Sequence, residues 1–207
     1  MRRFVPAGGE VLDWGSGNGH FTYFLQRAGY RANGFSLLPG DFRSWIPDPS
    51  YPFTLGSEAD PVKLPYADAT FDAVVSVGVL EHVRETGGEE AKSLAELTRV
   101  LKPGGVFICY HFPNQHSWID RMARRFPDMH RHEYRYTARD IRALVAGAGL
   151  RLETMARYGC LPRNSAGRLP NLLARSRNLA RSWDTADNLA GIVLARWCQN
   201  YVYVARK

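Results

Sequence analysis

The clearest indication of the fold is a stretch of nine residues, Val11-Leu12-Asp13-Trp14-Gly15-Ser16-Gly17-Asn18-Gly19. An apolar strand predicted over Glu10–Trp14 leads into a turn of glycines, and a helix is predicted over His20–Ala28. Glycine permits backbone angles that other residues resist, and it lets a ligand lie against bare backbone. The helix N-terminus that follows presents free N–H groups. The stretch therefore predicts a strand–turn–helix unit that binds a ligand at its turn.

Strand and helix patterns alternate outward from this unit, which is typical of a doubly wound parallel sheet. The clearest strand is Phe71–Val77, whose almost continuous apolar run suits a strand covered on both faces. Further strands are expected over Arg31–Ser36, Phe53–Leu55, Val106–Tyr110, Leu150–Arg157 and Asn200–Ala205. Helices are expected over Glu89–Leu101 and from a capping box at Thr137, with a turn over Lys102–Gly105. These elements fit one α/β domain over residues 1–207.

Residues 162–199 form a helical insertion before the last strand in this prediction. A basic amphipathic helix is expected around Leu169–Trp183 and a second helix around Thr185–Trp197. The first mixes leucines and a tryptophan with arginines, which suits peripheral contact with an anionic membrane surface. The alternative is a helix packed over the active site with its arginines in water.

The formal net charge of +7 over 207 residues allows two interpretations. One is a solvated basic surface; the other is an anionic partner such as phospholipid, a nucleotide-linked substrate or nucleic acid. Nucleic acid is the weaker choice because no groove-reading motif is present. The three cysteines, Cys109, Cys160 and Cys198, are scattered along the chain, which suits a reduced cytoplasmic protein. The longest apolar run, near Ala73–Leu80, is far shorter than the ~20 residues that a membrane span needs.

The carboxylate of Asp13 narrows the choice of ligand. A nicotinamide fingerprint would read G-x-G-x-x-G, whereas the spacing here is G-x-G-x-G with Asp13 two residues before the first glycine. A carboxylate would repel a phosphate at this place and attract the ammonium of an amino-acid-bearing cofactor. The alternative is that Asp13 only holds the turn together by accepting backbone N–H bonds.

Three further motifs follow the turn in order. They are Leu64–Val75 (LPYADATFDAVV), Val79–Val83 (VLEHV) and Leu97–Gly105 (LTRVLKPGG). With all four motifs, between about residues 10 and 160, the chain resembles the class I S-adenosylmethionine-dependent methyltransferases, closest to the quinone-biosynthesis-like group. The resemblance implies a Rossmann-like, doubly wound, mostly parallel seven-stranded sheet with an antiparallel last strand. It also implies S-adenosylmethionine as cofactor and S-adenosylhomocysteine as product.

The resemblance also implies roles for individual residues. Asp13 would face the methionine ammonium of the cofactor, and Gly15 and Gly17 would line its methionine and ribose. Val77 and Gly78, at the end of the fourth strand, would lie beside the methionine carboxyl group.

Two positions depart from the family pattern. Ser36 ends the second strand where relatives usually carry an acidic residue that binds both ribose hydroxyls. Asp60 matches the acidic residue expected near the adenine amino group, but Pro61 follows it and has no N–H, so a backbone bond to adenine must come from Val62. These departures keep open a non-catalytic relative that binds the cofactor without turnover.

Methyl transfer from a sulfonium is a direct displacement, so the protein chiefly aligns the reacting atoms. An oxygen nucleophile must also lose a proton, and histidine suits that task. His82 and His111 follow the predicted fourth and fifth strands, and His132 lies in the loop before the Thr137 helix. We predict O-methylation of a small or lipid-linked metabolite with these candidate bases; a nucleic-acid methyltransferase is the other alternative. No metal site is predicted, because the histidine spacing matches no ligand pattern.

Overall fold

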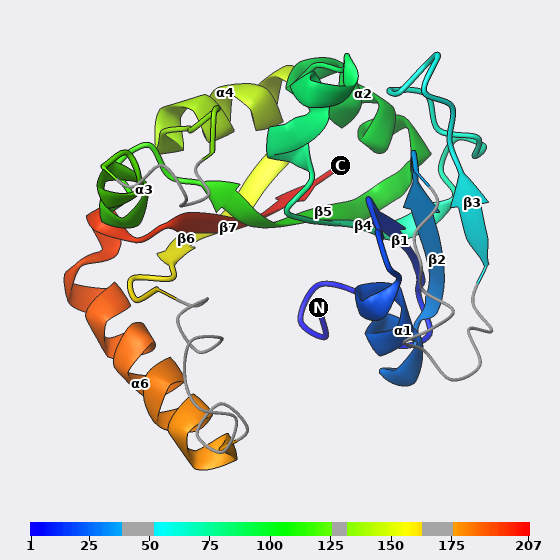
Figure 1. The fold of residues 1–207 in the computed structure, drawn as a ribbon. Helices are drawn as coiled ribbons and strands as arrows, with labels where there is room; N and C mark the ends of the chain where they lie inside the picture. The colour runs from blue at the N-terminus through cyan, green and yellow to red at the C-terminus, as the bar shows by residue number, and fades with distance from the viewer. Residues whose placement is uncertain (39–51, 126–131, 163–175) are drawn as a thin grey trace.

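The computed structural model describes residues 1–38, 52–125, 132–162 and 176–207 (Figure 1). Its centre is a seven-stranded sheet in the order β3-β2-β1-β4-β5-β7-β6. The strands are β1 (Glu10–Trp14), β2 (Arg31–Ser36), β3 (Phe53–Leu55), β4 (Phe71–Val77), β5 (Leu101–Pro113), β6 (Arg151–Tyr158) and β7 (Asn200–Arg206). Strands β1 to β5 pair in parallel, and β7 lies antiparallel to both β5 and β6. The predicted Rossmann-like sheet with an antiparallel last strand is therefore confirmed.

Helices cover both faces of this sheet (Figure 1). Helices α2 (Glu90–Val100) and α4 (Ala138–Gly147) pack on one face through side chains such as Leu97 and Val145. Helix α1 (His20–Arg27) packs on the other face through Leu25. The other helical segments are the 3-10 helices η1 (Leu80–Thr86) and η3 (Ala195–Trp197) and the helices α3 (Trp118–Ala123) and α6 (Arg177–Val193). Burial on both faces explains why β4 is an unbroken apolar run.

The predicted turn at Lys102–Gly105 lies inside a longer strand. Strand β5 begins directly after α2, and its pairing with β4 shifts from Phe71–Leu101 to Ala73–Val106. The residues between bulge out of the ladder, with Gly104 at φ +77°. The predicted turn was wrong, because the structure has a bulge within the strand at this place.

In the described part of the insertion, α6 (Arg177–Val193) spans the place where the first expected helix was to end and the second to begin. Residues 163–175 lie outside the described residues, and α6 runs without a break through Asp184 and Thr185. No glycine or proline interrupts the sequence from Ser176 to Ala190, so nothing ends the helix there. Asp187 is the buried residue of α6 and accepts a 2.7 Å bond from the Leu161 N–H. Among the described helices, none is both long and apolar enough to cross a bilayer.

Candidate active site

The glycine turn after β1 is tied to the neighbouring strand β2. The N–H groups of Gly15 and Ser16 both donate to the Phe35 carbonyl at 2.8 Å. Gly15 and Gly17 have φ of +80° and +50°, a left-handed region that favours glycine. A Cβ at Gly17 would meet no atom within 4 Å, so the backbone there is open. Ser16 Oγ is buried and has no hydrogen-bond partner within the part of the chain that the structure describes.

Asp13 lies at the end of β1, with only 2% of its surface exposed. Its Oδ2 accepts a 2.6 Å bond from the Thr22 hydroxyl on α1. Burial raises the pKa of Asp13 to about 6, although the bonds from Thr22 oppose the shift. The sequence carried no motif that pointed to Thr22. The carboxylate is thus desolvated, and a cation placed beside it would favour its ionised form.

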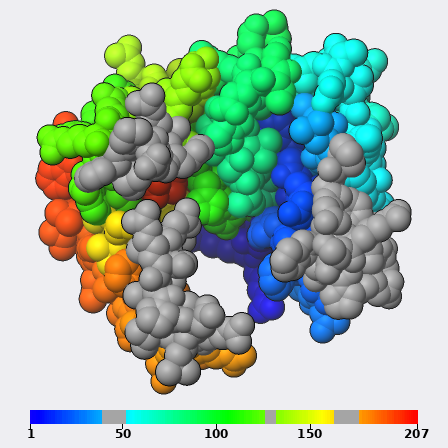
Figure 2. All heavy atoms as spheres, in the orientation of Figure 1, coloured from blue at the N-terminus to red at the C-terminus, as the bar shows by residue number. Residues whose placement is uncertain are grey.

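A pocket of roughly 230 Å³ lies over the carboxyl ends of β1, β2 and β4. Figure 2 shows the blue N-terminal part of the chain beside the green atoms that follow β4. The pocket is lined by Trp14, Gly15, Gly17, Phe35, Ser36, Leu37, Leu38, Pro61, Gly78, Val79, His82, Val83, Thr86 and Gly88. One pocket therefore contains four of the predicted cofactor residues and one predicted catalytic residue, which are Gly15, Gly17, Ser36, Gly78 and His82.

The other predicted cofactor residues lie elsewhere. Val77 packs against the apolar cluster on the α1 face of the sheet. Asp60 and Val62 line a second, neighbouring pocket, and Asp60 Oδ1 accepts a 3.3 Å bond from the Lys63 N–H. Pro61, between them, is the residue of this segment that reaches the first pocket. Asp13 does not line the first pocket either, and the roles of all eight predicted cofactor residues stay predictions.

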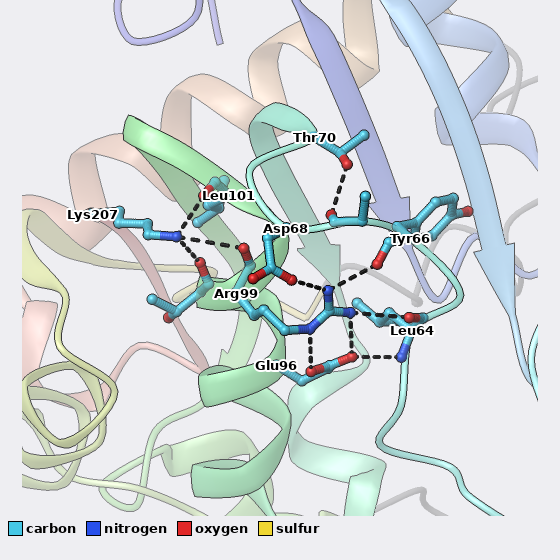
Figure 3. Close-up of polar contacts among 10 residues, drawn as sticks. Leu64, Tyr66, Asp68, Thr70, Glu96, Arg99, Leu101 and Lys207 are labelled. Atoms are coloured by element: carbon cyan, nitrogen blue, oxygen red, sulfur yellow. Dashed lines mark hydrogen bonds and ion pairs between the residues drawn. The ribbon is translucent and has the colours of Figure 1, made fainter.

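Arg99 anchors the loop that carries the second motif (Figure 3). Its guanidinium bonds the carboxylates of Glu96 and Asp68, each at 2.7 Å, and the carbonyls of Tyr66 and Leu64 at 2.8 and 3.1 Å. The two carboxylates raise the pKa of Arg99. Arg99 belongs to the fourth motif, so it links the second and fourth motifs structurally. The sequence motifs did not predict this role for Arg99.

A cluster of titratable side chains lies at the other side of the pocket. Glu81 and His82 belong to η1, and the rings of His82 and His132 have centroids 6.1 Å apart. His82 Nδ1 lies 2.7 Å from Glu85 Oε1, and His132 Nδ1 lies 3.5 Å from Asp120 Oδ1. Burial raises the pKa of Glu81 to about 7. The structure thus brings together two of the three predicted catalytic histidines.

An ion pair fixes η1, which carries this cluster, against α2. Arg84 Nε donates to Glu90 Oε2 at 2.9 Å, and the Tyr136 hydroxyl bonds the other carboxylate oxygen of Glu90. Arg84 also lies over the Tyr134 ring, 4.7 Å from its centroid. Glu90 is buried, so it depends on both partners. The arrangement holds η1 rigidly beside the pocket.

His111 lies apart from the other two histidines. Its backbone has φ +61°, a strained conformation for a residue other than glycine. The His111 N–H donates to the Tyr158 hydroxyl at 2.9 Å, and ring Nδ1 lies 3.1 Å from the same oxygen. A Cβ at Gly78 would lie 3.9 Å from His111 Cβ. His111 therefore neighbours Gly78 without itself lining the pocket, and its catalytic role stays a prediction.

Comparison with known proteins shows a similarity to methyltransferases. A family model described as a methyltransferase domain matches residues 12–109. A ubiquinone/menaquinone biosynthesis C-methyltransferase from Desulfotalea psychrophila is 38% identical over 120 residues, which are 52% of this chain and 46% of the relative. The chain is therefore similar to methyltransferases over about half of its length.

Two further similarities show how widely the methyltransferase fold is shared. A tRNA (carboxymethyluridine(34)-5-O)-methyltransferase from Arabidopsis thaliana is 35% identical over 50% of this chain and 24% of the relative. The crystal structure of a SAM-dependent methyltransferase from Archaeoglobus fulgidus superimposes with a TM-score of 0.63 at 17% identity, over 99% of this chain and 88% of that one. The chain spans less than half the length of the two named sequence relatives.

Proposed function

We propose that this chain transfers a methyl group from S-adenosylmethionine to a hydroxyl oxygen of a small or lipid-linked metabolite. The observation that carries the proposal is the shared pocket. It joins the open glycine turn after β1 to His82 after β4. Both lie at the carboxyl ends of parallel strands, where ligands bind in open α/β sheets.

The donor side of the pocket, formed by the glycine turn after β1 and by Ser36 at the end of β2, fits the cofactor chemically. Asp13 would balance the methionine ammonium, and the unpartnered hydroxyl of Ser16 and the open backbone of Gly17 offer polar contact and close approach. Ser36 would accept a bond from a ribose hydroxyl. When bound, S-adenosylmethionine supplies a methyl group on a positively charged sulfur. The acceptor attacks the methyl carbon and displaces that sulfur. The task of these residues is to hold that sulfur in line with the acceptor.

The acceptor side of the pocket supports a hydroxyl substrate. Val83 and Thr86 line the pocket beside His82, and His132 lies next to it. A hydroxyl must lose its proton as it attacks, and the Thr86 hydroxyl with the imidazoles of His82 and His132 can position the hydroxyl and receive the proton. The names of the two sequence relatives include a carbon and an oxygen methyltransferase, so our preference for oxygen rests on these side chains alone.

We also propose that α6 contacts an anionic lipid surface. Leu179, Trp183 and Val193 are exposed on one side of the helix, with Arg177 and Arg181 on the opposite side, where Ile192 is also exposed. A helix with a tryptophan-containing apolar stripe and a basic face suits the boundary between lipid and water. Such contact would bring a lipid-linked acceptor to the protein.

Mass spectrometry tests the methyl-transfer proposal. The protein is incubated with S-adenosylmethionine carrying a deuterated methyl group and with phenolic, hydroxyquinone and hydroxylated lipid acceptors. We expect S-adenosylhomocysteine together with a labelled methyl ether of one acceptor class. A label on carbon would overturn the assignment to oxygen. Cofactor binding without transfer to any acceptor would favour the non-catalytic relative.

A further inference from the structure

We propose that Glu81, His82 and His132 bind a divalent transition-metal ion of the zinc type on the acceptor side of the pocket. One ligand atom from each of these three residues lies within 4.8 Å of the others. Glu81 and His82 are neighbours in η1, and His132 reaches them from the segment before α4. The sequence predicted no metal site because its ligands are brought together by the fold and not by local spacing.

Each histidine of this site has a carboxylate on its Nδ1 side. Glu85 Oε1 lies 2.7 Å from His82 Nδ1, and Asp120 Oδ1 lies 3.5 Å from His132 Nδ1. Histidines that bind metals almost always donate their other ring N–H to such a partner, which fixes the tautomer and the ring orientation. Nε2 is then the nitrogen that the His82 ring would offer to the ion, whereas the 3.5 Å contact of His132 with Asp120 is an ion pair, longer than a hydrogen bond, and leaves the choice of nitrogen at His132 open.

The buried carboxylate of Glu81 supplies an independent reason for an ion. The residue is 3% exposed, and its Oε2 has no hydrogen-bond partner among residues that the structure describes. Its Oε1 lies 3.8 Å from the position that a Cβ on Gly78 would occupy, which places the carboxylate beside a residue that lines the pocket. A buried carboxylate oxygen without a partner is unfavourable, and a cation between Glu81 and the two imidazoles would satisfy it.

The donor set decides the class of ion. Two imidazole nitrogens and one carboxylate oxygen suit zinc and related transition ions better than magnesium or calcium, which prefer oxygen ligands. Three protein ligands with an open position are the arrangement of catalytic zinc sites. If the proposed function holds, the acceptor hydroxyl takes the open position and its proton leaves to solvent, so that with the ion bound His82 and His132 act as its ligands and do not themselves receive the proton. The oxygen then bonds the methyl carbon as the carbon–sulfur bond breaks. The ion site itself does not depend on that reaction.

Calorimetry with zinc chloride tests the site in the absence of S-adenosylmethionine. The full chain is first stripped with a chelator. We expect one ion per chain. The affinity for zinc should fall by about 100-fold or more in Glu81→Gln and in His132→Gln, and by about 10–100-fold in Asp120→Asn. His116→Gln is the matched control, because this histidine is outside the cluster, and it should bind as the wild type does. Equal affinity in all of these proteins would overturn the proposal.

X-ray absorption at the zinc edge keeps the proposal testable if a variant fails to fold. For the wild-type protein we expect two imidazole nitrogens at about 2.0–2.1 Å with oxygen in the remaining shell. Sulfur ligation, or a shell of oxygen alone, would overturn the site. Titration of the stripped protein with S-adenosylmethionine separates the two proposals. Zinc binding without cofactor binding would defeat only the proposed function, and the reverse would defeat only the metal site.

Discussion

Val79 packs directly against the bare backbone of Gly15. A Cβ at Gly15 would lie 2.3 Å from Val79 Cγ2, far inside any allowed contact. Val79 immediately precedes η1, so this contact fixes the spacing between the glycine turn and the helix that carries His82. The donor and acceptor sides of the pocket are thus positioned against each other by one glycine.

Gly15→Ala should therefore destabilise the protein more than Gly17→Ala. Both positions have positive φ, which costs alanine about 1–2 kcal/mol, but only Gly15 adds overlap with Val79, worth about 1–3 kcal/mol more. Urea denaturation of both variants measures the difference in the free energy of unfolding. Equal losses would show that Val79 moves aside freely.

The raised pKa of Asp13 predicts a pH-dependent stability. The folded-state pKa of about 6 lies above the ordinary value of 3.8, so folding favours the protonated acid. The resulting stabilisation is fully present below about pH 4 and is lost as pH rises through about 6. It amounts to at most about 3 kcal/mol relative to Asp13→Asn. Urea denaturation of both proteins from pH 4 to 7 checks this. A stability difference that does not change with pH would contradict the buried, desolvated carboxylate.

Ser36→Asp should strengthen cofactor binding. A charged acceptor contributes about 1.5–3 kcal/mol per hydrogen bond against about 1 for a neutral hydroxyl, so we expect a gain of roughly 2- to 30-fold in affinity. Ser57→Asp, at a position that does not line the pocket, is the control. Calorimetry with S-adenosylhomocysteine measures both. A gain confined to the control, or present equally in both variants, would exclude Ser36 from the ribose site.

Replacing Trp183 by serine should weaken binding to anionic vesicles. Trp183 is 41% exposed on α6, and its loss removes apolar area from the proposed lipid contact. We expect at least a several-fold loss in co-sedimentation with vesicles of mixed phosphatidylglycerol and phosphatidylcholine. Phe24→Ser, at an aromatic residue that is 65% exposed on α1, is the matched control. The lipid contact would be refuted by equal sedimentation of both variants, or by none from the wild type.

The sequence predicted the parts of the fold that depend on local pattern. Strands β1, β2, β3 and β4 have the predicted bounds, because apolar runs and glycine turns mark them directly. The capping box at Thr137 and Asp140 is present as expected. Strand β5 and helix α6 were predicted less well. The bulge in β5 and the continuous course of α6 depend on contacts with neighbouring segments, which the local sequence pattern does not contain.

The candidate site divides in the same way. Gly15, Gly17 and Gly78 were predictable because a positive φ or a close approach demands glycine there. The carboxylate partners of the histidines could not be predicted in this way. Asp120 comes from α3 and meets His132 only in the folded chain, so no sequence spacing pointed to the pair.

Calorimetry with S-adenosylhomocysteine and the Gly17→Val variant tests whether the glycine turn after β1 holds the cofactor. Gly17 lines the pocket and has open space in front of its backbone, so the added side chain would fill the cofactor site. Gly149→Val is the control, since Gly149 has φ +73° and open space but lies outside the pocket. We predict one cofactor per wild-type chain, binding weakened by about 10-fold or more in Gly17→Val, and no change in Gly149→Val. Equal affinity in all three proteins would contradict the account.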